Sequence, residues 1–275
     1  MGKILLERIL KRDIDHGGRL VEITGAMGTS KTGCLLAFIT HTLRLHPEEK
    51  IFFREQTNAP LQIYKLRNKY QVFIQKGADV TFRDRNEKLK EIEVGAIEFT
   101  NFQDLWKKSK PGVVSVPFFK EPYDWMEFMT FLREVGEWVN VFVDEMADIC
   151  PGTNSGALYK RMNEFSKTAG AFRRCMMNVF YNTQSVSDVD WRVRKKVMVY
   201  IYFRGARPDK KSRVTQKAID GLEINHKKGN EAYIDYSGEF GKVRFTDIFH
   251  PDHRFHIEAH VPQKTKQEME AESDE

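Results

Sequence analysis

The stretch GAMGTSKT, residues 25–32, contains the residue types that bind phosphate groups. The phosphate-binding loop pattern is G-x-x-x-x-G-K-[ST]. Gly25, Lys31 and Thr32 fit it, whereas Ser30 stands where the second glycine belongs. In such a loop, backbone N–H groups wrap the phosphates, the lysine bridges the β- and γ-phosphates, and the hydroxyl ligates Mg²⁺. The candidate ATP-binding residues are therefore Gly25, Ala26, Met27, Gly28, Thr29, Ser30, Lys31 and Thr32.

Ser30 is the departure from that pattern. Glycine at this position keeps side-chain atoms away from a crowded phosphate, and serine adds a Cβ atom there. Serine also adds a hydroxyl, which is able to hydrogen-bond a phosphate oxygen. We therefore expect weakened or altered nucleotide affinity rather than the loss of binding.

Two adjacent acids, Asp144 and Glu145, follow the apolar run of residues 139–143. That run predicts a buried strand, whose end directs Asp144 into the crevice beyond the carboxyl edge of an α/β sheet, where ligands bind. There Asp144 would hold Mg²⁺, and Glu145 would polarise the attacking water as a general base. The alternative is a carboxylate pair that caps a helix after a strand. Lys31 and Thr32 upstream favour the ligand site.

The elements around these residues alternate between strand and helix. Residues 19–24 predict a strand before the loop, and residues 31–46 predict a buried helix after it, which ends before Pro47. Further strands are expected at 51–55, 138–145, 175–184 and 197–203. This alternation predicts an α/β fold, with a mainly parallel sheet and helices on both faces. Gln184, at the end of one strand, is either a sensor of the γ-phosphate or a turn residue.

The patterns also predict how the chain is divided. We expect a phosphate-loop core with an N-terminal helix over residues 1–205, which an irregular insertion at about 58–135 interrupts. Within the insertion, the patterns indicate helices at 61–70 and 122–135 and extended segments at 94–99 and 113–118. Residues 206–262 predict a C-terminal β-hairpin extension of the same domain, which turns at 237–238. The acidic residues 263–275 predict a disordered tail.

Composition favours an intracellular protein. No run of eighteen apolar residues is present, so no membrane-spanning helix is expected. The three cysteines are scattered and odd in number, which favours a reducing setting without a disulfide framework. We therefore expect a cytoplasmic protein without a membrane anchor in this chain.

Basic residues are concentrated in residues 192–213. That window contains nine Lys and Arg residues against a single acid, Asp209, a net of +8, in a chain whose formal net charge is +5. A basic segment of this density suits a polyanion such as DNA, and the alternative is an ordinary solvated surface. The candidate DNA-binding residues are Arg192, Arg194, Lys195, Lys196, Lys210, Lys211 and Arg213.

A histidine cluster near the C-terminus is a candidate metal site, formed by His250, His253, His256 and His260. However, apolar and polar residues alternate strictly over residues 255–261. This alternation is typical of a half-buried strand with a polar outer face. We therefore favour a strand over a metal site.

The three motifs together resemble the FtsK/HerA superfamily of ring-forming DNA-translocating ATPases, which includes viral genome-packaging motors. GAMGTSKT is similar to the G-x-x-G-S-G-K-S of that family, and VNVFVDE resembles its hydrophobic strand that ends in Asp-Glu. AFRRCMMNVFYNTQSVSDVD resembles its segment of arginine, hydrophobic strand and Thr-Gln. The resemblance covers about residues 18–205, except for 58–135.

The resemblance implies a RecA-like P-loop NTPase core that assembles into a homo-oligomer, a hexameric ring with double-stranded DNA in its pore. It implies that Gln184 senses the γ-phosphate and that Arg173, or else Arg174, reaches the ATP of a neighbouring subunit as an arginine finger. The expected function is a Mg²⁺-dependent ATPase that translocates DNA for viral or plasmid genome packaging or transfer, alongside viral or plasmid partner proteins. The alternatives are a P-loop ATPase that drives phage assembly or protein secretion, and a hydrolysis-deficient nucleotide-binding scaffold.

Overall fold

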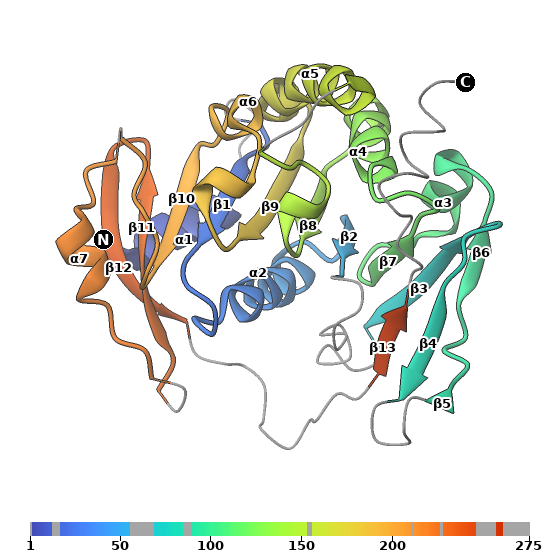
Figure 1. Cartoon of the computed structure of the whole chain (residues 1–275), viewed down its shortest axis with the longest axis horizontal. Coiled ribbons are helices and arrows are strands. Elements are labelled where there is room, and N and C mark those ends of the chain that lie inside the picture. The colour runs from blue at the N-terminus through green and yellow to red at the C-terminus, as the bar shows by residue number, and fades with distance from the viewer. Residues whose placement is uncertain are drawn as a thin grey trace.

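The structure is a computed structural model of the chain (Figure 1). It describes residues 2–12, 17–55, 69–84, 90–152, 156–210, 212–225, 228–245 and 257–260. Within these ranges, no helix is both long enough and apolar enough to cross a membrane.

Ten of the described strands form one sheet, in the order β12-β11-β10-β1-β9-β8-β2-β7-β3-β6. The strands are β1 (Leu20–Thr24), β2 (Lys50–Arg54), β3 (Tyr70–Gln75), β4 (Thr81–Asp84), β5 (Lys90–Glu91), β6 (Ile97–Phe99), β7 (Val114–Phe118), β8 (Val139–Val143), β9 (Met177–Thr183), β10 (Val199–Phe203), β11 (Asn230–Tyr236), β12 (Glu239–Phe245) and β13 (Ile257–His260). The eight strands from β10 to β6 are parallel to their neighbours, and β11 and β12 are antiparallel. The expected mainly parallel α/β sheet is therefore confirmed.

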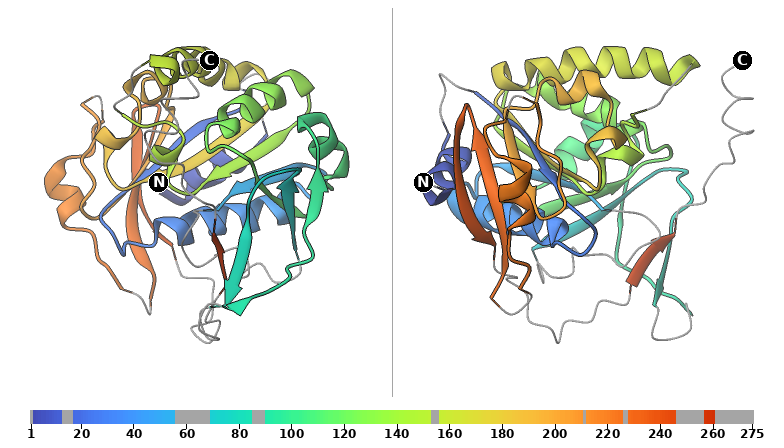
Figure 2. Two further views of the ribbon diagram at one scale, coloured as in Figure 1. Left: turned by 45° about the vertical axis from the view of Figure 1, so that its right-hand side comes forward. Right: turned by 60° about the vertical axis from the view of Figure 1, so that its left-hand side comes forward.

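Helices cover both faces of this sheet (Figures 1 and 2). They are α1 (Gly2–Leu10), α2 (Lys31–Leu45), α3 (Phe102–Lys108), α4 (Asp124–Val135), α5 (Gly156–Ala171), α6 (Trp191–Arg194) and α7 (Gln216–Asp220), with the 3₁₀ helices η2 (Met146–Asp148), η3 (Phe172–Arg174) and η4 (Val186–Asp188). In Figures 1 and 2, α2 lies on one side of the sheet, and α4, α5 and α6 lie on the other. The central strands are therefore buried on both faces, which explains why apolar residues predominate in β8 and β9, although β9 also contains buried asparagines.

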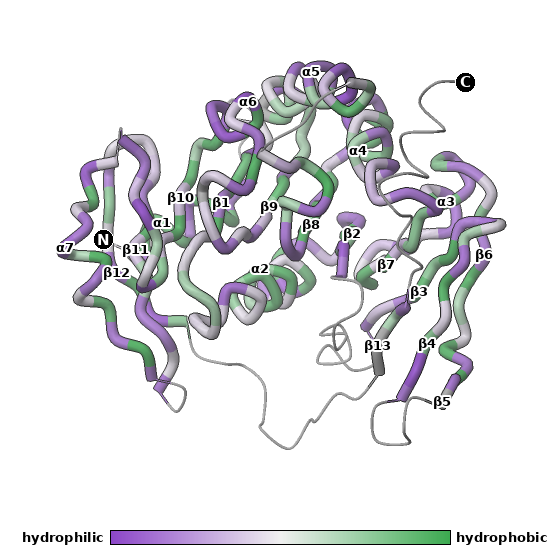
Figure 3. The backbone as a smooth tube through the Cα atoms, in the orientation of Figure 1, coloured by the Kyte–Doolittle hydropathy of each residue, from purple (hydrophilic) through white to green (hydrophobic). Residues whose placement is uncertain are grey.

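Two large hydrophobic clusters result, one on each face, and a smaller third cluster includes Tyr202 and Ile219. On the α2 face, the Phe142 and Phe180 rings stack at a centroid distance of 4.8 Å, and Figure 3 shows hydrophobic residues concentrated on α2. On the opposite face, Phe128 of α4 meets Phe52 edge-on at 4.9 Å. The aromatic residues of α4 are therefore core residues, as their helical spacing indicates.

The stretch expected to be an irregular insertion contributes to the main sheet. β7, β3 and β6 extend it beyond β2, with α3 and α4 on one face. β3 lacks a clean alternation of apolar and polar residues, and β6 and β7 are short, so the sequence pattern did not reveal their sheet partners. Residues 61–68 of the expected helix lie outside the described residues, and Tyr70 begins β3 instead.

The C-terminal part forms a hairpin and a separate strand. β11 and β12 pair through the expected turn, where Ser237 and Gly238 have φ values of 53° and 81°, the left-handed pair of a type I′ hairpin. β13 pairs with β4 in a second, three-stranded sheet, in which Ala259 is buried. The expected strand at the histidine cluster is therefore present over 257–260, whereas His250, His253 and His256 lie outside the described residues.

Candidate active site

The site lies where three neighbouring parallel strands end. β9 lies between β1, which leads into the phosphate loop, and β8, which leads to Asp144 (Figure 1). The register pairs Ile23 of β1 with Asn182 of β9, and Val143 of β8 with Tyr181. The carboxyl ends of the three strands are thus level, and the loop and the acids approach each other across β9.

Two residues of the loop over residues 25–30 have a left-handed backbone conformation. Gly28 and Ser30 have positive φ values of 77° and 64°, and the Lys31 backbone opens α2. Left-handed residues in such a loop turn successive N–H groups toward one point, and a helix N-terminus adds a favourable dipole. Lys31 Nζ donates to the carbonyl oxygens of Gly25 and Ala26, at 2.9 and 3.0 Å.

Ser30 adopts the backbone conformation that the pattern assigns to glycine. A left-handed conformation costs a non-glycine residue about 1–2 kcal/mol. The Ser30 hydroxyl accepts a hydrogen bond of 2.8 Å from the side-chain amide of Asn230, at the start of β11. This bond offsets part of the backbone cost and joins the phosphate loop to the C-terminal hairpin.

Thr32 and Asp144 meet across the site. Thr32 Oγ1 donates to Asp144 Oδ1 at 2.9 Å. Asp144 is buried, and its backbone N–H donates to the carbonyl oxygen of Arg54 at 3.0 Å, which extends the pairing of β8 with β2 by one residue. The motifs at 25–32 and 144–145 are thus brought into direct contact.

Asn182 is a site residue that the sequence analysis missed. Its side-chain amide donates to Asp144 Oδ1, and its Oδ1 atom accepts from the backbone N–H of Glu145 at 2.7 Å. The backbone of Glu145 has a left-handed conformation, with φ 57°, which this bond helps to hold. The available signal was a polar residue inside the buried strand, two positions before Gln184 and so on the same face.

Arg54, at the end of β2, was also missed. Its guanidinium is buried and donates to the carbonyl oxygens of Asp144 and Glu145, and to Asp148 Oδ2 at 2.8 Å. A buried arginine that binds successive carbonyl groups fixes the direction of the chain after β8. The feature of the sequence that could have revealed Arg54 is an arginine directly after the apolar residues of β2.

Burial shifts the pKa values of Asp144, Glu145 and Lys31. Burial raises the pKa of Asp144, although hydrogen bonds from Asn182 and Thr32 oppose that rise. Burial raises the pKa of Glu145, and the nearby carboxylates of Asp148 and Asp144 raise it further. Burial lowers the pKa of Lys31, whereas the nearby carboxylates of Glu145 and Asp144 raise it. Charged groups with shifted pKa values that lie this close together are typical of a site that binds a charged ligand.

The donor and acceptor atoms fit ATP and Mg²⁺. The Lys31 ammonium and the N–H groups of the loop are the donors that phosphate oxygens require. The Thr32 hydroxyl and the Asp144 carboxylate are oxygen ligands of the kind that Mg²⁺ prefers. Gly25 lies against Phe203, whose Cβ atom a methyl group on Gly25 would approach to 2.6 Å, so this end of the loop accepts only glycine.

The other residues expected in the site lie at the two ends of β9. Gln184 is exposed immediately after β9. Arg174 is exposed in η3, before β9 begins and hence at the opposite end of the strand, and the side chain of Arg173 lies outside the described residues.

The basic window divides into paired and exposed residues. Arg192 forms an ion pair with Asp190 at 2.7 Å, and Arg194 lies 3.3 Å from the buried Glu22. The exposed members are Lys195, Lys196, Arg204, Arg207, Lys210 and Arg213, and Lys211 lies outside the described residues. Arg192 and Arg194 are thus engaged in intramolecular ion pairs.

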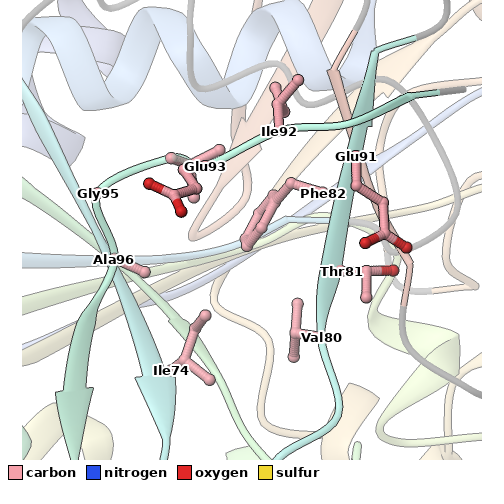
Figure 4. Close-up of a pocket in the computed structure, with 10 residues that line it drawn as sticks. Ile74, Val80, Thr81, Phe82, Glu91, Ile92, Glu93, Gly95 and Ala96 are labelled. Atoms are coloured by element: carbon pink, nitrogen blue, oxygen red, sulfur yellow. The ribbon is translucent and has the colours of Figure 1, made fainter.

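A separate hollow lies between β4 and the β3–β6 edge of the sheet. It has a volume of about 430 Å³ and is lined mainly by apolar residues, with Glu91 and Glu93 at its rim (Figure 4). Residues of the phosphate loop do not line it. It is therefore distinct from the candidate site.

Solved structures with a similar fold include genome-packaging proteins of viruses. The genome-packaging NTPase B204 of Sulfolobus turreted icosahedral virus 2 in complex with AMPPCP has a TM-score of 0.55 and 12% identity, over 82% of this chain and 97% of that chain. B204, the DNA-packaging ATPase from Sulfolobus turreted icosahedral virus, has a TM-score of 0.51 and 14% identity, over 83% and 98%. No family model and no curated protein sequence matches this chain.

The B204 structures cover almost their whole length against this chain, so the likeness extends over most of the described fold. At identities of 12–14%, that likeness concerns the fold. The chain therefore has an α/β P-loop NTPase fold similar to that of the viral packaging NTPases, in agreement with the resemblance of its motifs to the FtsK/HerA superfamily.

Proposed function

We propose that this protein is a Mg²⁺-dependent ATPase that translocates double-stranded DNA, as a ring-forming motor for viral or plasmid genome packaging or transfer. The observation that carries the proposal is the contact of Thr32 with Asp144 across β9, beside Lys31 and Glu145. A phosphate-binding lysine, two Mg²⁺-binding oxygens and a base that lie close together are the parts that phosphoryl transfer requires.

Each residue has a role in ATP hydrolysis. Lys31 exchanges the loop carbonyls that it now contacts for the β- and γ-phosphates, and Thr32 and Asp144 hold the metal. Bound Mg²⁺ supplies positive charge that neutralises the transferring phosphoryl group. Glu145 accepts a proton from the attacking water, and its raised pKa brings it nearer to the working pH, where a general base is most effective. Gln184 senses the γ-phosphate at the exposed end of β9.

The DNA and the ring are the further parts of the proposal. B204 is described as a genome-packaging NTPase and a DNA-packaging ATPase, and the basic window of this chain offers exposed cations for a phosphate backbone. Lys195, Lys196, Lys210 and Arg213 are the DNA contacts that we propose. Arg173 and Arg174, at the opposite end of β9 from the site, would serve a neighbouring subunit of a hexamer.

The proposal is tested by ATP hydrolysis of the purified protein, with and without double-stranded DNA. We expect hydrolysis that needs Mg²⁺ and that DNA stimulates, and we expect Glu145→Gln to lower the turnover number about 100-fold or more while ATP binding persists. Glu164→Gln, a change of an exposed acid on α5, is the matched control and should leave turnover unchanged. Hydrolysis without DNA stimulation would favour an ATPase that moves protein, and binding without turnover would favour a scaffold.

A further inference from the structure

Asn230 is a buried side chain that the roles above do not use. It begins β11, lies 200 positions from Ser30 in the chain, and is 2% exposed. Its amide nevertheless contacts the phosphate loop, through the hydrogen bond to Ser30 Oγ. The C-terminal hairpin therefore places a polar group beside Ser30, the residue that replaces the glycine of the loop pattern.

The direction of that hydrogen bond follows from the other partner of Asn230. The backbone N–H of Asn225, which is able only to donate, points at Asn230 Oδ1 at 2.8 Å. This contact fixes the orientation of the amide, so that its NH₂ group faces Ser30. The Ser30 hydroxyl is thus the acceptor of the bond at 2.8 Å.

A serine hydroxyl that accepts from an amide keeps its own proton for another acceptor. Asn230 thereby prevents the Ser30 hydroxyl from pointing its proton at the hairpin. A phosphate oxygen held by the loop is an acceptor of matching chemistry, and a hydrogen bond to a charged oxygen is about twice as strong as one between neutral groups.

We propose that Ser30 donates its hydroxyl proton to a phosphate oxygen of the bound nucleotide, and that Asn230 is the positioning residue that directs it there. The inference rests on the proposed function, because it assigns a further binding group to the same ATP site. It gives the glycine-to-serine departure a role, since the added hydroxyl supplies a donor that a glycine does not have.

The hairpin is built to hold Asn230 in place. Arg244 of β12 donates to the carbonyl oxygen of Gly229 at 3.0 Å and to Glu231 at 3.0 Å, so the two residues on either side of Asn230 are tied to the neighbouring strand. Lys242 adds a second ion pair to Glu231, at 2.9 Å. A positioning residue needs such support, because its effect depends on a fixed side chain.

The test is a titration of the intact protein with a fluorescent ATP analogue and Mg²⁺, which gives a dissociation constant. We expect Asn230→Ala to weaken binding about 3-fold or more, and Asn230→Asp to weaken it about 10-fold or more. An aspartate has nearly the shape of asparagine and still accepts from Asn225. However, its carboxylate attracts the Ser30 proton and places a negative charge beside the phosphates.

A Ser30→Gly background separates positioning from mere structural support. In that background, Asn230→Ala should change affinity less than about twofold, because the hydroxyl that it directs is gone. An equal loss in both backgrounds would overturn the inference. Asn230→Asp that bound as tightly as the wild type would overturn it as well, because its carboxylate would then neither redirect the Ser30 proton nor repel the phosphates.

Thermal unfolding of each variant shows whether a loss of binding reflects a loss of fold. A wild-type protein that bound no nucleotide would defeat the proposed function together with this inference. A wild-type protein that bound it, with all Asn230 variants binding equally well, would defeat this inference alone.

Discussion

The side-chain amide of Asn182 donates a hydrogen bond to the carboxylate of Asp144 from the strand that lies between the phosphate loop and the acids. In this strand order, β1 and β8 are not neighbours, so the ends of these two strands are separated by the width of β9, and Thr32 reaches Asp144 from the first turn of α2. Asn182 fills that separation, and its second bond, to the backbone of Glu145, aligns the candidate base as well. One side chain therefore positions both acids.

Replacement of Asn182 by alanine should impair chemistry as well as stability. Asp144 loses a donor and the Glu145 N–H loses its acceptor, and each loss in a buried site costs about 1–3 kcal/mol. We expect the turnover number for ATP to fall about 10- to 100-fold. Steady-state hydrolysis at several Mg²⁺ concentrations is the measurement.

The matched control is Asn178→Ala, on the same strand. Asn178 is buried as well, but it bonds to Arg19 N and Asn140 at the far end of β9. Its loss should lower the melting temperature and leave the turnover number within about twofold. If the two variants lost turnover equally, Asn182 would have no specific role in positioning the acids.

The exposed lysines after α6 are expected to contact DNA. Lys195 and Lys196 are exposed, so Lys195→Glu with Lys196→Glu should weaken DNA binding without unfolding the protein. The slope of log K against log salt should become shallower by about 0.9 for each DNA phosphate that the variant no longer neutralises. DNA titrations at several salt concentrations measure that slope, and an unchanged slope would remove these lysines from the DNA surface.

Replacement of Arg194 should lower stability rather than DNA binding, because its side chain forms intramolecular ion pairs. Its guanidinium approaches the fully buried Glu22 at 3.3 Å and Asp209 at 3.8 Å. Arg194→Ala leaves a buried carboxylate without its cation, at a cost of about 3 kcal/mol or more in the free energy of unfolding. Urea denaturation measures this cost. A variant as stable as the wild type would show that Arg194 is available for DNA after all.

The buried carboxyl group of Glu22 should make the stability of the protein depend on pH. Burial raises the pKa of Glu22 above its ordinary value of 4.5, and among the described residues its Oε1 atom has no hydrogen-bond partner. The folded state therefore binds this proton more tightly than the unfolded chain does. The free energy of unfolding should fall as pH rises from about 4.5 through the folded pKa.

Glu22→Gln removes that titration, and it should raise the melting temperature at pH 7. The difference between variant and wild type should shrink as pH falls below 4.5, where both side chains are neutral. Tyr181, which donates to Glu22, keeps an acceptor in the variant. Melting temperatures of both proteins over pH 4–8 test this, and a difference independent of pH would contradict it.

Much of the central sheet was predictable because burial on both faces leaves a strong signal. β8 and β9 are runs of apolar residues that end in polar ones, and the turn at Ser237 and Gly238 needs two left-handed residues. β3, β6 and β7 were not assigned to the sheet, because they are short and their partners lie far away in the chain. Pairing of that kind depends on tertiary contacts rather than on local pattern.

The site was predictable only in part, for a related reason. Lys31, Thr32 and Asp144 belong to motifs in which spacing carries the information. Asn182 and Asn230 act through contacts with residues 38 and 200 positions away, and no local spacing encodes such contacts. The net charge of the basic window likewise did not reveal which cations were paired.

Gly25 provides a last prediction, on the shape of the phosphate loop. A Cβ atom at this position would lie 2.6 Å from the Phe203 Cβ and 2.9 Å from Thr29 Oγ1, too close for either contact. Gly25→Ala should therefore push the loop away from β10, at a cost of about 1–3 kcal/mol, and should weaken ATP binding in the same titration. Gly95→Ala is the control, because Gly95 has a positive φ but no atom within 4 Å of its added Cβ. Gly95→Ala should lower the free energy of unfolding by about 1 kcal/mol and leave the affinity for ATP unchanged. If Gly25→Ala bound ATP as tightly as Gly95→Ala, the phosphate loop would tolerate its displacement from β10.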